Sequence, residues 1–169
     1  MGYGAGYSTQ GQQAVAVGYL AGSNAQGGLA VAIGNQAGLS NQGARSIAIG
    51  SGAASTGQQI RAVAIGPSAG FGNQGICAIG IGQSAGNSNQ GNQAIAMGSN
   101  AGNLGQGLGS VAIGQQSGQT NQGQRSVAIG FQSAATTQGQ FSVAVGDFAG
   151  NVSQGNTAVA IGEASAQTA

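Results

Sequence analysis

Charged and large aromatic side chains are almost missing from this sequence of 169 residues. It has no Trp, no His and no Lys, and 3% of its residues are charged. Affinity for nucleic acid comes from several basic side chains that neutralise successive phosphates. Three Arg and a formal net charge of +1 provide no basic patch of that kind, so we expect no nucleic-acid partner.

Long apolar runs are missing as well. A Gly, Gln or Asn interrupts every stretch well before the roughly eighteen apolar residues that a membrane-spanning helix requires. The first residues, Met1-Gly2-Tyr3-Gly4, lack the basic start and apolar run of a secretion signal. We therefore expect no membrane insertion, and no signal peptide or anchor in this chain.

Residues that carry chemistry are scarce. Cys77 is the single cysteine, which excludes a disulfide within the chain, and we expect it to be a small packing residue. Asp147 and Glu163 are the only carboxylates, and they occupy the same turn position in successive repeats. Their spacing predicts surface charges rather than a catalytic pair. The sequence thus indicates no enzyme, no metal site and no cofactor.

Glycine, in contrast, is abundant and strictly spaced. It recurs every sixteen residues from Gly2 to Gly162, with no insertion or deletion. Glutamine keeps the same spacing, and a Gly follows it everywhere except after Gln58, where Gln59 stands. Self-similarity at a fixed period is typical of repeats that stack on their neighbours. We therefore expect a single repeat domain over residues 1–169.

The repeat unit predicts short strands rather than helices. Sixteen residues are too few for two packed helices, Gly is frequent, and Val and Ile alternate with Ala. We expect an all-β fold, a parallel β-solenoid or β-roll of about ten coils that forms a rod about 50 Å long. Gln-Gly is expected to form one turn of each coil, with the Gly at positive φ, and the Gly that ends each Val-Ala-Ile strand to form the other.

The repeated Gln predicts a structural column along the rod, because stacked amide side chains hydrogen-bond to one another. The expected members of this column are Gln10, Gln26, Gln42, Gln58, Gln74, Gln90, Gln106, Gln122, Gln138 and Gln154.

The strand positions hardly vary among the copies, and this holds for both faces of the strand. A solenoid alone in water should restrict one face and let the other become polar. Either face can line the coil interior, and we expect the other to be buried against another copy of the chain, since it would expose about 500 Å². The expected interface or core ladder is Val15, Val17, Val31, Ile33, Ile47, Ile49, Val63, Ile65, Ile79, Ile81, Ile95, Met97, Val111, Ile113, Val127, Ile129, Val143, Val145, Val159 and Ile161.

Turn positions vary freely and are the expected place for any surface recognition. Arg45, Arg61 and Arg125 share one repeat position, where they either add solubility and protect an edge or contact a ligand. A second turn position carries aromatic side chains in several copies, either as receptor contacts or as packing at subunit boundaries.

The strand motif Arg125-Ser126-Val127-Ala128-Ile129-Gly130, with Ser133 three residues on, resembles the head repeats of trimeric autotransporter adhesins of the YadA-like type. The resemblance covers essentially the whole chain. It implies a left-handed parallel β-roll, assembly into homotrimers, and an extracellular adhesive head. The repeats are also similar to those of fibre proteins of phages and large DNA viruses, which implies a virion surface as the other location.

We therefore expect a structural fibre or adhesin head that is displayed on a cell or virion surface and contacts a host receptor or matrix. One alternative is a structural filament without a ligand that grows by end-to-end stacking, because solenoid ends without caps expose unpaired backbone. Another is an ice-binding solenoid, although its usual Thr ladder is incomplete, with Thr56, Thr120 and Thr136 in only some coils.

Overall fold

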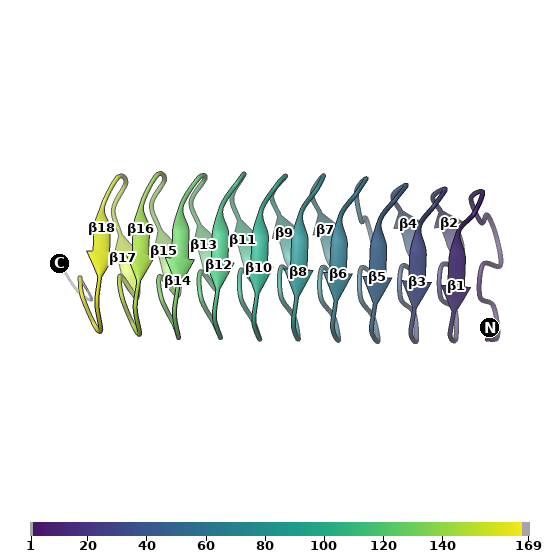
Figure 1. Cartoon of the computed structure of the whole chain (residues 1–169), viewed down its shortest axis with the longest axis horizontal. Helices are drawn as coiled ribbons and strands as arrows, with labels where there is room; N and C mark the ends of the chain where they lie inside the picture. Colours follow the sequence, from purple (N-terminus) through teal and green to yellow (C-terminus); the bar gives the residue numbers. More distant parts are fainter. Residues whose placement is uncertain (1, 167–169) are drawn as a thin grey trace.

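A computed structural model describes residues 2–166 as a straight stack of coils, with the two ends of the chain at opposite ends of the rod (Figure 1). Met1 and residues 167–169 of the expected domain lie outside the described residues. The described part contains no helix, and all its strand pairs are parallel. Nine turns of sixteen residues lead from the first strand of the larger sheet to the last. The expected all-β solenoid is confirmed.

The larger sheet has ten strands and is formed by the Val-Ala-Ile segment of every coil. Each residue pairs with the residue sixteen positions further on, for example Val15 with Val31. Identical positions therefore stack along the whole sheet. Its strands, in spatial order, are β1 (Val15–Val17), β3 (Val31–Ile33), β5 (Ile47–Ile49), β6 (Val63–Ile65), β8 (Ile79–Ile81), β10 (Ile95–Met97), β12 (Val111–Ile113), β14 (Val127–Ile129), β16 (Val143–Val145) and β18 (Val159–Ile161).

A second sheet lies behind the first (Figure 1) and consists of the three residues that end at the repeat Gln. It is divided into a two-stranded and a six-stranded part, and Thr56 joins them through single bridges to Ser40 and Gly72. The interruption lies in the one coil whose Gln is not followed by Gly. The strands are β2 (Asn24–Gln26), β4 (Ser40–Gln42), β7 (Gly72–Gln74), β9 (Ser88–Gln90), β11 (Leu104–Gln106), β13 (Thr120–Gln122), β15 (Thr136–Gln138) and β17 (Val152–Gln154).

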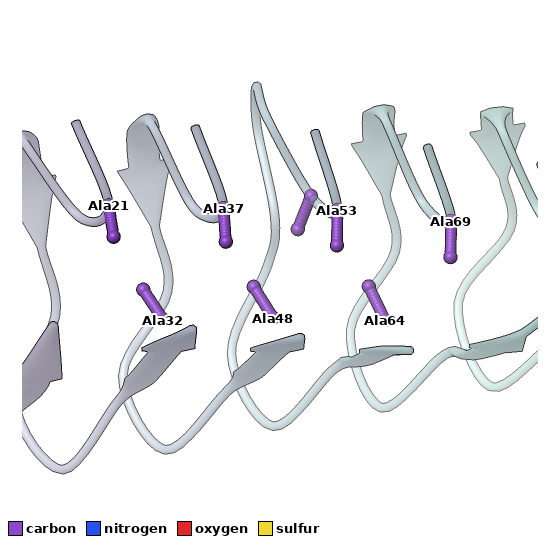
Figure 2. Packing of buried hydrophobic residues seen from close by; sticks show 8 residues of the cluster. Ala21, Ala32, Ala37, Ala48, Ala53, Ala64 and Ala69 are labelled. Atoms are coloured by element: carbon purple, nitrogen blue, oxygen red, sulfur yellow. The ribbon is translucent and has the colours of Figure 1, made fainter. Parts of the chain in front are cut away.

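The interior of the rod is lined by alanine. The middle residue of each larger-sheet strand points inward, and so does the Ala of the turn that follows the strand. The methyl groups of Ala32 and Ala48 point toward those of Ala37 and Ala53, and all four residues are fully buried (Figure 2). The sequence left open which strand face lines the coil. The coil is so narrow that the small face lies inside.

Serine replaces alanine at several interior positions, and each of these hydroxyls is hydrogen-bonded to backbone. Ser126 Oγ donates to the carbonyl of Gly123 at 2.7 Å, three residues back. Ser117 Oγ and Ser133 Oγ donate to the carbonyls of Ala128 and Ala144 in the next coil, at 2.6 and 2.9 Å. A buried hydroxyl costs free energy unless it is bonded, so these contacts explain why Ser and Ala interchange here.

The repeat Gln bridges the two sheets from inside the coil. From Gln26 to Gln154 these side chains are buried, and each Nε2 donates to the carbonyl of the first residue of a larger-sheet strand in the preceding coil. Gln42 Nε2, for example, donates to Val31 O at 2.8 Å. Because this bond joins one coil to the next, the Gln ties the two sheets together and also ties successive coils.

Amide-to-amide contacts along the Gln column occur at three steps. Gln58 Nε2 donates to Gln74 Oε1 at 3.0 Å, and Gln74 Nε2 donates to Gln90 Oε1 at 3.1 Å. The third step joins Gln138 to Gln154, also at 3.1 Å. Bonds from the amide to the backbone are thus the regular feature of the column.

Two glycine positions in each coil bring backbone against backbone. A Cβ on Gly91, which follows a repeat Gln, would lie 2.7 Å from Gly107 C in the next coil. A Cβ on the strand-closing Gly98 would lie 2.7 Å from Gly114 O, and Gly98 has φ +124°. Adjacent coils therefore touch along two columns that are glycine in nearly every coil, and Gln59 is the exception in the column after the repeat Gln.

The expectation that the Gly after Gln takes positive φ is wrong. The left-handed residue of that turn lies two positions later, at Arg45 (φ 58°), Arg61 (φ 60°) and Cys77 (φ 56°) among others. This conformation costs a non-glycine residue about 1–2 kcal/mol, and the stacked coils impose it nonetheless. Close approach of the next coil, rather than positive φ, favours the Gly after the repeat Gln, a position that Gln59 occupies in one coil.

We predict that Gln74→Met lowers the free energy of unfolding by about 2–4 kcal/mol, because it removes a buried network of hydrogen bonds. Gln74 Nε2 donates to Val63 O at 2.6 Å in addition to its amide contacts. Urea unfolding followed by circular dichroism measures the loss. Gln124→Met, at an exposed turn position, should change stability by less than about 0.5 kcal/mol. Equal effects of the two variants would contradict the bridging role.

We also predict that Gly98→Ala destabilises the rod by more than about 2 kcal/mol, because the new methyl meets backbone and φ is unfavourable for Ala. Gly28→Ala is the matched control, since the nearest atom to its Cβ would be Gln12 O at 3.5 Å. The melting temperature of each variant distinguishes them. Equal melting temperatures for Gly98→Ala and Gly28→Ala would refute close backbone contact between coils at Gly98.

Candidate interaction surface

The first and third residues of every larger-sheet strand point outward and form two columns of Val, Ile and Met. They are the expected interface or core ladder, and the structure places none of them in the coil interior. In the middle of the rod Ile113 and Ile129 are both 37% exposed. At the last strand, where no described coil stacks further, Val159 and Ile161 are 65% and 67% exposed. Stacked neighbours thus cover much of each side chain, and one outer surface stays bare.

This outer surface, which we call the apolar face, is continuous over ten strands. Ten strands that each occupy about 4.8 Å along the rod, with a width of three residues, give an area of about 500 Å². None of its twenty outward positions carries a charged or hydrogen-bonding side chain. Apolar patches of this size on soluble proteins are often functional, so the apolar face is the candidate site of this molecule.

Two rows of turns border the apolar face. The turn before each strand contains the two residues after Gln-Gly, such as 44–45 and 124–125, and we call this row the leading edge. The turn after each strand contains the two residues after the closing Gly, such as 131–132 and 147–148, and we call this row the trailing edge.

The three arginines all lie on the leading edge and are exposed. Arg45 and Arg61 stand in consecutive coils, as their spacing predicts. The guanidinium of Arg125 lies over the ring of Phe141, in the next coil, at 5.8 Å from Cζ to the ring centroid. Such a cation–π contact holds an exposed Arg side chain in one direction along the rod. The half-buried Cys77 occupies the same repeat position.

Both carboxylates lie on the trailing edge, opposite the arginines. Asp147 is exposed, and its Oδ1 accepts a hydrogen bond of 3.4 Å from the backbone N–H of Phe131 in the preceding coil. Glu163 occupies the same position one coil further on. Phe131 and Phe148 contact each other edge to face, with ring centroids 5.2 Å apart. The trailing edge therefore combines acidic and aromatic side chains near residues 131–148.

Other kinds of site find little support in the part of the chain that the structure describes. Residues 2–166 contain no group of three His, Cys, Asp or Glu side chains that could hold a metal ion. The same residues also include no helix that is long and apolar enough to cross a membrane. A hollow of about 590 Å³, lined by residues such as Gly2, Gln10 and Val15, lies at the open end of the coil stack next to β1.

Phe141 and Phe148, which lie on the two edges, were not among the recognition residues expected from the sequence, although Phe141 shares the repeat position of the arginines. Three of the four Phe of the chain lie between positions 131 and 148, beside one Arg and one Asp, and this concentration was the available signal. It becomes meaningful only when the fold assigns these residues to two opposite edges.

The fold and the apolar face define a parallel β-solenoid with one outer sheet face that lacks polar cover. Comparison with known protein families finds the YadA head domain repeat twice, at residues 42–69 and 122–149. Each matched segment begins at a repeat Gln and ends at a buried Ala of the turn after the second strand of the larger sheet that it contains. The resemblance to YadA-like head repeats is confirmed in these segments. No curated protein and no solved structure matches the chain.

Proposed function

We propose that this chain is an adhesin-like structural β-roll that assembles into a homotrimer through the apolar face and is displayed on the outer surface of a cell or virion. The single observation that carries the proposal is the uninterrupted apolar face. An isolated rod would expose twenty outward Val, Ile and Met side chains, and burial of that surface drives association.

Three copies suit this face better than a pair of stacked sheets. Three parallel rods around a threefold axis can each turn one narrow face toward the axis. The apolar face suits this arrangement because it is three residues wide in every coil. The YadA-like repeats support this arrangement, because the resemblance implies trimeric heads. The function follows from the assembly, which is a stiff spacer about 50 Å long.

Contact with a host receptor or matrix would use the surfaces that such a trimer leaves outside. The second sheet lies on the far side of the rod from the apolar face (Figure 1). In β15, for example, Thr136 and Thr137 are exposed, whereas Gln138 points inward. A mostly polar and repetitive outer surface suits a structural or adhesive role rather than catalysis.

We predict that the double variant Val127→Lys and Ile129→Lys folds but no longer forms trimers. Both side chains point outward, so Lys ammonium groups reach water in the monomer and would be buried in the trimer. Light scattering on the purified protein should give the trimer mass for the unchanged chain and the monomer mass for the variant at micromolar concentration. Circular dichroism tests whether the fold persists.

The matched control places the same charges on the second sheet. Leu104 and Val152 are each 47% exposed, and their replacement by Lys should leave the trimer intact. Unchanged trimers in the Val127→Lys and Ile129→Lys variant would contradict assembly through the apolar face. A monomeric unchanged chain, or long fibres in place of discrete trimers, would overturn the proposed assembly itself.

A further inference from the structure

The regularity of the apolar face creates a problem for any assembly built on it. Every row presents nearly the same Val, Ile or Met side chains, and rows repeat about every 4.8 Å. Two such ladders can slide past each other by one coil and lose only one row of contact. Regular strands specify register weakly for this reason. The heights of the subunits must be fixed by residues that break the repeat.

The residues that break the repeat on both edges gather at one height of the rod. On the leading edge, Arg125 lies over Phe141. On the trailing edge, Phe131 packs against Phe148, and Asp147 bonds to the Phe131 backbone. All five residues belong to the turns on either side of β14 and β16, which are neighbours in the sheet.

Arg125 and Asp147 do not meet within one chain, because the strand separates the two edges by up to about 20 Å. Their heights nevertheless agree. The Arg125 guanidinium leans toward the coil of Phe141, which precedes β16, and Asp147 follows β16. The Asp147 carboxylate leans back toward Phe131, so the two groups approach a common level from opposite sides.

In a cyclic assembly of parallel rods, the leading edge of each subunit faces the trailing edge of the next. The apolar face covers about 500 Å² per subunit, whereas a specific interface usually covers about 800 Å² per partner. Contacts at the edges are therefore needed to complete the interface. Opposite charges and aromatic rings at the same height are the complementary groups available for them.

We propose that Arg125 of one subunit pairs with the partner's Asp147, with Phe141 packed against the partner's Phe131 and Phe148, and that this clasp sets the axial register of the trimer. The inference rests on the proposed trimer and adds which residues align its subunits. A ring closes only without axial offset, whereas a slip of one coil gives an open, growing assembly. The clasp thus selects trimers over filaments.

The other arginines provide an internal contrast. Arg61 occupies the same repeat position as Arg125 and is also exposed, but the trailing edge at its height carries Ser51, Pro67 and Gln83. No carboxylate is available there. Arg61 is therefore a matched control for Arg125.

Charge reversal tests the clasp. Arg125→Glu places a carboxylate against the partner's Asp147 at each of the three interfaces of the trimer. We expect the association constant to fall about tenfold or more, as measured by sedimentation at decreasing protein concentration. We also expect staggered, polydisperse species. Arg61→Glu should match the unchanged chain, and the double variant Arg125→Asp with Asp147→Arg should restore discrete trimers. At 0.5 M salt the difference should shrink.

Crosslinking gives a second readout that does not depend on affinity. In a Cys77→Ser background, Arg125→Cys with Asp147→Cys and a short thiol-to-thiol reagent should yield covalent trimers. The pair Arg61→Cys with Asp147→Cys is five coils apart in height, about 24 Å, and should not crosslink within a trimer.

The outcomes separate the two proposals. If the unchanged chain does not form trimers, the proposed function fails and the clasp fails with it. If trimers form but Arg125→Glu behaves like Arg61→Glu and the Arg125/Asp147 cysteine pair gives no covalent trimer, the clasp is wrong while the trimer stands.

Discussion

The spacing of about 4.8 Å between stacked coils is the constraint on which the rest of this molecule depends. All coils have sixteen residues, so every side chain must fit against the residue at the same repeat position in the coils above and below it. Gly is required where the backbones of adjacent coils touch, as at Gly91 and Gly98. Ala and Ser fill most of the narrow interior, and the larger Gln side chain crosses it to bond with backbone.

The same constraint determines the outer surface. At the strand positions the coil interior has room only for small side chains such as Ala and Ser, so Val and Ile lie outside, where the rod leaves them partly exposed. The inner face of each strand thus packs the single coil, and the outer face is the one that the proposed trimer buries. Regular stacking also makes the apolar face uniform along its length. In the proposed trimer, the axial register of the subunits therefore depends on the few turn residues that differ among coils, such as Arg125, Phe141 and Asp147.

The turns show how far the stack overrides local preference. Arg45, Arg61 and Cys77 adopt a left-handed conformation that their residue types disfavour. The Gly after the repeat Gln, in the same turn, does not have positive φ. Local propensity alone assigned the positive φ to the wrong residue, because it ignores the next coil. Close approach between coils, which is a tertiary feature, decides where Gly must stand and where strain is tolerated.

The sequence by itself determined the solenoid. A period of sixteen without insertions fixes the coil length, alternating β-branched residues favour strands, and both follow from local sequence. The low variability of both strand faces also predicted two buried surfaces. Only the tertiary structure decided that Ala32 and its equivalents lie inside and the Val and Ile columns outside, because strand alternation separates the faces without assigning them. It alone brought Arg125 beside Phe141 and Asp147 beside Phe131, since contacts between coils depend on the direction in which each side chain leans along the rod.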